Sequence, residues 1–164
     1  MRILGIDPGS ICTGWGVIEE HEQGIKVLAS GEIRVGRGKL AKRLASIYEH
    51  LVEVVETHRP DVAAVEEVFH ARNTKSALVL GQARGVVLLA VGLAGVEIHE
   101  YSPRTVKQTV TGHGGADKRQ IQRMIAATLG EAPDSLDASD ALAVALCHSR
   151  WLSDPARQKG DGES

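Results

Sequence analysis

Short apolar runs occupy the first part of the chain and indicate β-strands. Residues 2–7 (RILGID) form a β-rich run that ends at a Pro-Gly turn, residues 13–19 alternate apolar and polar side chains, and residues 26–35 form a third such run. Glycines at 36 and 38 interrupt the pattern. We expect three strands that hairpins can join into an antiparallel group.

The middle of the chain changes to helical periodicity. Apolar residues recur every three or four positions over residues 40–58, which is typical of an amphipathic helix, and Pro60 ends it. Residues 61–66 (DVAAVE) are apolar without clean alternation, a pattern that favours an interior strand. Residues 73–94 predict a helix that is apolar on nearly all sides, so it is buried either in the core or against another subunit.

The last third of the chain predicts one more strand and then helices. Residues 96–101 form the strand, Ser102 and Pro103 give a helix-start signal, and residues 118–129 and 135–151 predict two helices.

Strands linked by helical crossovers should run parallel, so the element order predicts an α/β protein: a mixed five-stranded sheet with helices on both faces. We assign residues 1–152 to one domain. Residues 153–164 are polar and Gly-rich and are expected to be a disordered tail.

The composition agrees with one globular domain. The chain has 164 residues, of which 43% are hydrophobic and 24% charged, which excludes a wholly disordered protein. The two cysteines lack metal-binding spacing. The first residues lack the features of a signal peptide, and the longest apolar run, 86–96, is shorter than a membrane span. We therefore expect a cytoplasmic protein with no membrane partner.

Charge is distributed unevenly along the chain. The net charge is −2, yet residues 68–123 contain eight Lys and Arg against three acidic residues. A basic region of this kind can form a phosphate-binding face, because attraction to phosphate acts within a screening length. An unevenly charged solvated surface is an equally good explanation of the charge alone.

Four carboxylates are candidates for chemistry. Asp7 and Glu66 each end a predicted strand, and Asp137 and Asp140 share one face of the last helix. Taken singly, Asp7 could stabilise a turn, Glu66 could be a solvated strand end, and Asp137 could interact with the helix dipole. Asp140 precedes a long apolar run, where an unpaired carboxylate is costly. Together the four acids suit oxygen-preferring ions such as Mg²⁺ or Mn²⁺, although structural ion networks also cluster acids.

Five sequence blocks resemble a known family. In chain order, the blocks are GIDPGSICTGWGV (5–17), VEEVFHARN (65–73), LGQARGV (80–86), RTVKQTVTGHGGADK (104–118) and DASDALAVALCH (137–148). Their sequences, order and spacing closely resemble those of RuvC-type Holliday-junction resolvases. The resemblance extends over nearly the whole chain up to Trp151. Any one block is weak evidence for this family, but five blocks in the same order and at matching spacing are specific to it.

The resemblance implies a ribonuclease-H-like fold and a homodimer that binds a four-way DNA junction and nicks two opposing strands symmetrically. The acidic quartet of the family falls on Asp7, Glu66, Asp137 and Asp140. Its basic residues fall on Lys107 and Lys118, and its aromatic residue that stacks near the crossover falls on Phe69. The family usually works with the branch-migration proteins RuvA and RuvB.

These assignments lead to a mechanistic expectation. Asp7 would bridge two Mg²⁺ ions, which Mn²⁺ could replace, with Glu66 on one side and Asp137 and Asp140 on the other. Lys107 and Lys118 hold the scissile phosphate. Phe69, Arg72 and Asn73 lie in an exposed DNA-binding loop, where the aromatic ring can stack on an unpaired base; a core position for Phe69 is the alternative.

Two other functions are weighed against the resolvase. The segment DPGS (7–10) with Thr13 and Gly14 also resembles the phosphate loop of actin-like ATPases, but those proteins need two lobes and this chain has the length of one. A non-catalytic junction-binding module of the same fold is the second alternative. The presence of all four acids argues against it.

Overall fold

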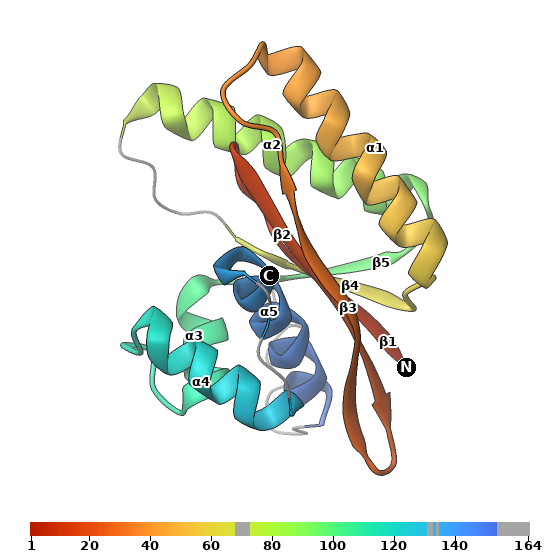
Figure 1. The fold of residues 1–164 in the computed structure, drawn as a ribbon, viewed down its shortest axis with the longest axis vertical. Helices are drawn as coiled ribbons and strands as arrows, with labels where there is room; N and C mark the ends of the chain where they lie inside the picture. The colour runs from red at the N-terminus through yellow and green to blue at the C-terminus, as the bar shows by residue number, and fades with distance from the viewer. Residues whose placement is uncertain (68–72, 131–132, 134, 154–164) are drawn as a thin grey trace, which may run out of the picture.

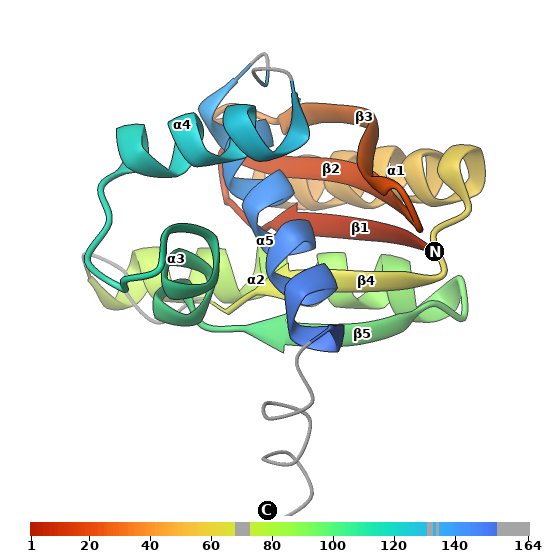
Figure 2. The same cartoon turned by 90° about the horizontal axis from the view of Figure 1, so that it is seen from below.

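A central sheet of five strands organises the molecule. The computed structural model (Figure 1) describes residues 1–67, 73–130, 133 and 135–153. Its strands lie in the order β3-β2-β1-β4-β5 (Figure 2). The strands are β1 (Arg2–Asp7), β2 (Cys12–His21), β3 (Gly24–Arg34), β4 (Val62–Glu66) and β5 (Glu97–Tyr101). β1 to β3 pair antiparallel, whereas β4 pairs parallel with both β1 and β5. The mixed sheet predicted from the sequence is confirmed.

Helices cover both faces of this sheet, as the element order predicted. α1 (Leu40–His58) and α2 (Thr74–Leu93) lie on one face, and α3 (Pro103–Thr111), α4 (Lys118–Leu129) and α5 (Leu136–Leu152) lie on the other (Figure 2). The strands alternate between the two cores, because successive side chains of a strand point to opposite faces. Leu4 and Ile6 pack under α1 and α2, whereas Ile3 packs under α5.

Capping residues define where the helices begin. Ser135 caps α5, where its side chain accepts a hydrogen bond from the Ala138 amide, and Ser102 caps α3 with Pro103 in the first turn. A reciprocal capping box between Asp117 and Gln120 starts α4. Each helix start lies within one or two residues of the position that the pattern predicted.

Glycines let α5 approach the sheet closely. A Cβ placed on Gly5 would lie 2.1 Å from the Ala141 carbonyl oxygen, and one on Gly16 would lie 2.7 Å from the Leu142 side chain. No real Cβ tolerates such a contact with backbone. α5 therefore rests directly on β1 and β2, and the residues of its first turns are fixed against the strand ends.

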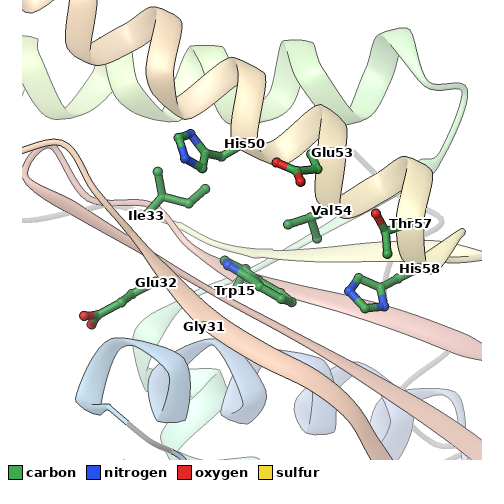
Figure 3. Close-up of a pocket in the computed structure, with 9 residues that line it drawn as sticks. All are labelled: Trp15, Gly31, Glu32, Ile33, His50, Glu53, Val54, Thr57 and His58. Carbon is green, nitrogen blue, oxygen red and sulfur yellow. The ribbon is translucent and has the colours of Figure 1, made fainter.

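A cavity of about 360 Å³ lies on the opposite side of the sheet, between β2, β3 and α1. Trp15, His50, Glu53 and His58 surround it, whereas Glu32 points away from His50 and Glu53 (Figure 3). The rings of Trp15 and His58 lie 5.7 Å apart. None of the four acids predicted from the sequence lines this cavity.

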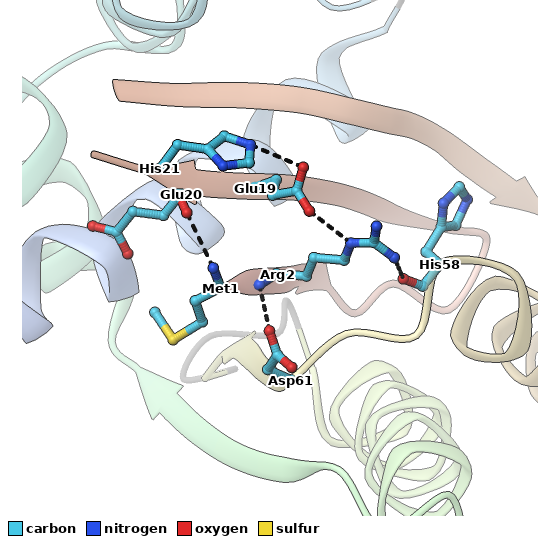
Figure 4. A network of polar contacts seen from close by, with 7 residues as sticks. All are labelled: Met1, Arg2, Glu19, Glu20, His21, His58 and Asp61. Carbon is cyan, nitrogen blue, oxygen red and sulfur yellow. Dashed lines mark hydrogen bonds and ion pairs between the residues drawn. The ribbon is translucent and has the colours of Figure 1, made fainter. Parts of the chain in front are cut away.

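Polar contacts fix the start of β1. The Arg2 Nε donates to Glu19 at 2.9 Å, its guanidinium also donates to the His58 carbonyl, and its amide donates to Asp61 (Figure 4). The N-terminal ammonium donates to the Glu20 carbonyl at 3.0 Å. These contacts join β1 to β2 and to the turn after α1, so the register that places Asp7 is held at the other end of its strand.

Candidate active site

Asp7 and Glu66 come together because they end neighbouring parallel strands. Ile6 pairs with Val65, so the next residue of each strand lies at the same edge of the sheet. Asp7 shares the face of Ile3 and Gly5, which is the face that α5 covers. Strand topology alone therefore places two carboxylates side by side under the first turns of α5, as the sequence predicted.

α3, α4 and α5 complete the site. A cavity of about 200 Å³ is lined by Asp7, Glu66, Asp140, Lys107 and Lys118, together with Pro103, Val106, Ile121 and Ala143. Its acids come from β1, β4 and α5, and its lysines come from α3 and the first residue of α4. Five of the six residues proposed for catalysis thus line one small cavity.

Burial and mutual repulsion raise the pKa values of two acids in this cavity, Asp7 and Glu66. Burial, followed by the charges of Glu66, Asp140 and Asp137, raises the pKa of Asp7 to about 8. Burial also raises the pKa of Glu66, against which Lys107 and Lys118 act. With a pKa of about 8, the Asp7 carboxyl holds a proton at neutral pH when no cation is bound.

The two lysines offset part of this negative charge. Lys118 Nζ lies 3.0 Å from Asp140 Oδ2, and this contact raises the pKa of Lys118. The side chain of Lys118 is 67% exposed whereas that of Asp140 is 20% exposed, so the ammonium lies at the mouth of the cavity. It remains accessible to a ligand that arrives from solvent.

Asp137 lies beside this cavity and not in its lining. The charge of Asp137 contributes to the raised pKa of Asp7. The Asp137 carboxylate lies next to Cys12 of β2 and Glu32 of β3, and the carboxylate oxygens and the sulfur of these three residues lie within 4.8 Å of one another. Cys12 and Glu32 were missed by the sequence reasoning. Strand alternation could have indicated them, because Cys12 and Gly14 share a face and Gly14 pairs with Glu32.

The acidic set suits a divalent cation. Carboxylates that repel one another at a buried strand edge form a position where a cation could offset their charge. Carboxylate oxygens are the ligands that Mg²⁺ and Mn²⁺ prefer. Asp7, Glu66, Asp140 and Asp137 are therefore the residues that could hold such ions.

The proposed DNA-binding loop is described only at its end. Phe69 and Arg72 lie outside the described residues. Asn73 is exposed and caps α2, where its side chain accepts a hydrogen bond from the Ser76 amide at 2.9 Å. That hydrogen bond uses the Oδ1 atom, and the Asn73 amide group remains a donor for a ligand.

Solved structures show the same fold. The RuvC structure of Thermus thermophilus aligns with a TM-score of 0.85 at 34% identity over 93% of this chain and 96% of that one. The structure described as T. thermophilus RuvC in complex with Holliday junction substrate aligns with a TM-score of 0.86 at 35% identity, covering 97% and 96% of the two chains. The yeast mitochondrial Holliday junction resolvase Ydc2 shares the fold alone, with a TM-score of 0.68 at 13% identity over 92% of this chain and 80% of that one. The protein is thus a nuclease-type α/β domain with a ribonuclease-H-like fold and an acidic site at the strand ends.

Sequence comparison identifies the family. The model of the crossover junction endodeoxyribonuclease RuvC family matches residues 3–148. The RuvC protein of Chloroflexus aurantiacus is 49% identical over 152 residues, which cover 91% of this chain and 93% of that protein. The RuvC protein of Pseudomonas aeruginosa is 50% identical over 149 residues, which cover 90% and 85%. The chain belongs to the RuvC family of crossover junction endodeoxyribonucleases.

Proposed function

We propose that this protein resolves four-way DNA junctions by metal-dependent, symmetric nicking of two opposing strands. The observation that carries the proposal is the convergence of Asp7, Glu66 and Asp140 with two lysines in one cavity of a RuvC fold. The complex of T. thermophilus RuvC with a Holliday junction substrate supports the same kind of substrate for this chain.

The four acids have the role of metal ligands in this proposal. Asp7, Glu66, Asp137 and Asp140 would hold two divalent ions, Mg²⁺ with Mn²⁺ as a substitute. Such ions lower the pKa of a water for attack on phosphorus and stabilise the leaving 3′ oxygen. The protein's own contribution is to fix these carboxylates on three rigid elements, two strands and a helix, so that little reorganisation accompanies metal binding.

The lysines would hold the scissile phosphate. Lys107 and Lys118 face the acids from α3 and α4, and their charges act on Glu66. A phosphodiester brought to the cavity mouth would meet two ammonium groups, which attract it and offset the charge that develops on its oxygens. Both residues therefore bind DNA and assist the chemistry.

The segment before α2 would contact the open centre of the junction. Phe69 would stack on an unpaired base, with Arg72 and Asn73 beside it on the DNA. The proposal is supported by the resemblance of residues 65–73 to the family block and by the exposure of Asn73 at the start of α2.

The exposed side of α2 would form a homodimer interface. Leu78, Leu89 and Leu93 are 64%, 54% and 68% exposed. Gly81, Gly85 and Gly92 fall between them at helical spacing, and a Cβ added to any of the three would meet no described atom within 4 Å. Leucines of one copy can pack over the glycines of another about a two-fold axis, which would supply two identical sites for two cuts.

The alternative is that the exposed side of α2 contacts a membrane. By length and mean hydropathy (1.7), Thr74–Leu93 could cross a bilayer, and it is the one helix of the described residues that could. Ala83, Val87, Ala90 and Val91 on its other side are buried in the protein core, however. We therefore propose a cytoplasmic dimer that would work with the RuvA and RuvB branch-migration proteins.

Cleavage of a synthetic mobile four-way junction tests the function. We expect paired, symmetric nicks in the junction with Mg²⁺ or Mn²⁺, and no nicks in EDTA or in a linear duplex of the same sequence. Asp7→Asn should abolish cutting and leave junction binding intact, whereas Glu56→Gln, which changes an exposed carboxylate of α1 on the opposite face of the sheet, should cut normally. Tight junction binding without cutting in either metal would favour the non-catalytic module.

A further inference from the structure

Cys12 and Glu32 lie on the far side of Asp137 from the cavity. The register of the sheet explains this placement: Asp7 pairs with Gly14, and Gly14 pairs with Glu32, so one row crosses β1, β2 and β3 on the face of α5. Gly14 has no side chain, and the start of α5 occupies the space above it. Asp137 therefore lies between Asp7 at one end of the row and Glu32 at the other.

The Cys12 and Glu32 side chains lie against the first turn of α5. The Cys12 thiol donates to Glu32 Oε2 at 3.8 Å, and its sulfur lies within 4.8 Å of a carboxylate oxygen of Asp137. The Arg34 guanidinium donates to Glu32 Oε2 at 3.0 Å and holds that carboxylate in place.

The thiol acts here as a neutral donor. Its contact with Glu32 uses the S–H proton, so the sulfur carries no charge while it donates. A donor next to an aspartate restricts how that carboxylate rotates about its Cβ–Cγ bond. A neutral donor does this without supplying a positive charge that would compete with a cation for Asp137.

We infer that Cys12 and Glu32 are positioning residues that orient the Asp137 carboxylate toward the metal-binding acids. The Cys12 sulfur lies within 4.8 Å of the Asp137 carboxylate, and Glu32, held by Arg34, orders the thiol by accepting its hydrogen bond. Neither residue touches the cavity in which cutting takes place. The inference rests on the proposed role of Asp137 as a metal ligand.

Two substitutions at Cys12 separate the hydrogen bond from packing. Cys12→Val keeps an apolar side chain on a strand and removes the donor, whereas Cys12→Ser keeps a donor. A hydrogen bond to a charged group is worth about a tenfold change in an equilibrium. We expect Cys12→Val to weaken Mn²⁺ binding to the DNA-free protein about tenfold by calorimetry, and to raise the Mg²⁺ concentration for half-maximal junction cutting by a similar factor.

The controls distinguish positioning from folding. Cys12→Ser should stay within about threefold of the wild type, because a hydroxyl also donates to a carboxylate. Junction affinity in EDTA and the melting temperature should be unchanged in Cys12→Val. Glu32→Gln should weaken metal binding in the same direction, and Glu97→Gln, at an exposed position of β5, should not.

Three outcomes would overturn the inference. The inference fails if Cys12→Val binds metal as tightly as the wild type. It also fails if Cys12→Ser loses as much metal affinity as Cys12→Val and both variants have a lower melting temperature. An Asp137→Asn variant that binds metal and cuts like the wild type removes both the inference and the proposed role of Asp137. If Asp137→Asn is inactive while Cys12→Val is normal, the proposed function stands and only the positioning role fails.

Discussion

Gly14 of β2 lies directly beneath Asp137 of α5: a Cβ added to Gly14 would lie 2.0 Å from the Asp137 carbonyl oxygen. Helix and strand are therefore in backbone contact at the position where the site is assembled. Asp137 and Asp140 reach the strand ends because nothing larger than hydrogen stands between α5 and β2. The geometry of the acidic set thus depends on a residue that carries no functional group.

Replacing Gly14 by alanine should separate α5 from the strand ends. The new methyl group cannot be accommodated without movement of the helix backbone, so we expect a loss of about 1–3 kcal/mol in the free energy of unfolding. Junction cutting should fall by at least about 100-fold, because ångström-scale displacement of catalytic groups is costly. Urea unfolding and single-turnover cleavage measure the two effects.

Gly38→Ala is the matched control for this change. A Cβ at Gly38 meets no described atom within 4 Å, and its φ is not positive, so the same chemical change should be neutral. Cutting at the wild-type rate by Gly14→Ala would show that α5 does not need this contact.

Asp7 should make the metal-free protein less stable as pH rises. Its pKa is about 8 in the folded protein against 3.8 for an ordinary aspartate, so the folded state holds a proton that the unfolded state has already lost. The stabilising contribution of that proton is fully present below about pH 4 and is lost as pH rises through 8. In EDTA at pH 8, Asp7→Asn should be more stable than the wild type by roughly 1–2 kcal/mol.

The pH dependence of the difference is the diagnostic observation. Urea unfolding of both proteins in EDTA at pH 5 and pH 8 should show a larger gap at pH 8, because only the wild type must then bury an additional charge. Added Mg²⁺ should reduce the gap by binding the folded wild type. A gap independent of pH would indicate that the repulsion among the acids is weak.

The sequence predicted the sheet, its mixed strand directions and the two helical layers, because each element has a clear period and is bounded by turn residues. Asp7 and Glu66 could be placed together from this level alone, since parallel strands end at one edge. The contact of Asp140 with Lys118 was not predicted, since no periodicity specifies which turn of α5 lies over which strand end.

Cys12 and Glu32 show what sequence reasoning could not supply. Each is an ordinary residue of an alternating strand, and their contact with Asp137 depends on the register of two hairpins and on the close approach at Gly14. The exposed side of α2 illustrates a different limit. Its uniform apolarity left open whether the helix was buried in the core or against a partner, and the structure shows one side buried and the other exposed.

Lys118 should matter more for cutting than for junction binding. Its ammonium lies 3.0 Å from Asp140 at the mouth of the cavity, where a single phosphate can reach it. We expect Lys118→Met to reduce the single-turnover cutting rate by roughly 10- to 1,000-fold, the range for loss of one group that stabilises developing charge. Junction affinity should change little, because many other contacts contribute to it.

The neighbouring residue provides the comparison for Lys118. Arg119→Met removes the same charge from the same turn of α4 without removing the contact to Asp140, so it should cut nearly normally. Equal losses in both variants would mean that general charge, and not the position of Lys118, determines the effect.

A charge on the exposed side of α2 should dissociate the proposed dimer. Leu89 is 54% exposed at the centre of the leucine and glycine surface, and a carboxylate there would face its own copy across a two-fold axis. Leu89→Glu should sediment as a monomer at micromolar concentration and lose paired nicking. Met124→Glu, at a 39% exposed position of α4, should remain dimeric. A wild-type protein that is already monomeric would refute the interface.

His148 should make the protein acid-sensitive through a different part of the core. It is 1% exposed, its Nδ1 lies 2.6 Å from the Tyr101 hydroxyl, and burial followed by repulsion from His99 lowers its pKa to about 4. The unfolded chain takes up a proton at the ordinary histidine value of 6.5, whereas the folded protein does not until about pH 4. Stability from this group is therefore present above pH 6.5 and is lost as pH falls through 4.

Glutamine at position 148 should remove this dependence, because it can still accept a hydrogen bond from Tyr101 and does not titrate. Between pH 6.5 and 4.5 we expect the free energy of unfolding of the wild type to fall relative to that of His148→Gln by up to about 3 kcal/mol. His21→Gln, at an exposed position of β2, should follow the wild type. Since Asp7 acts in the opposite direction over part of this range, the measurement is best made in the Asp7→Asn background. Parallel pH profiles for the two proteins there would show that His148 is protonated inside the core.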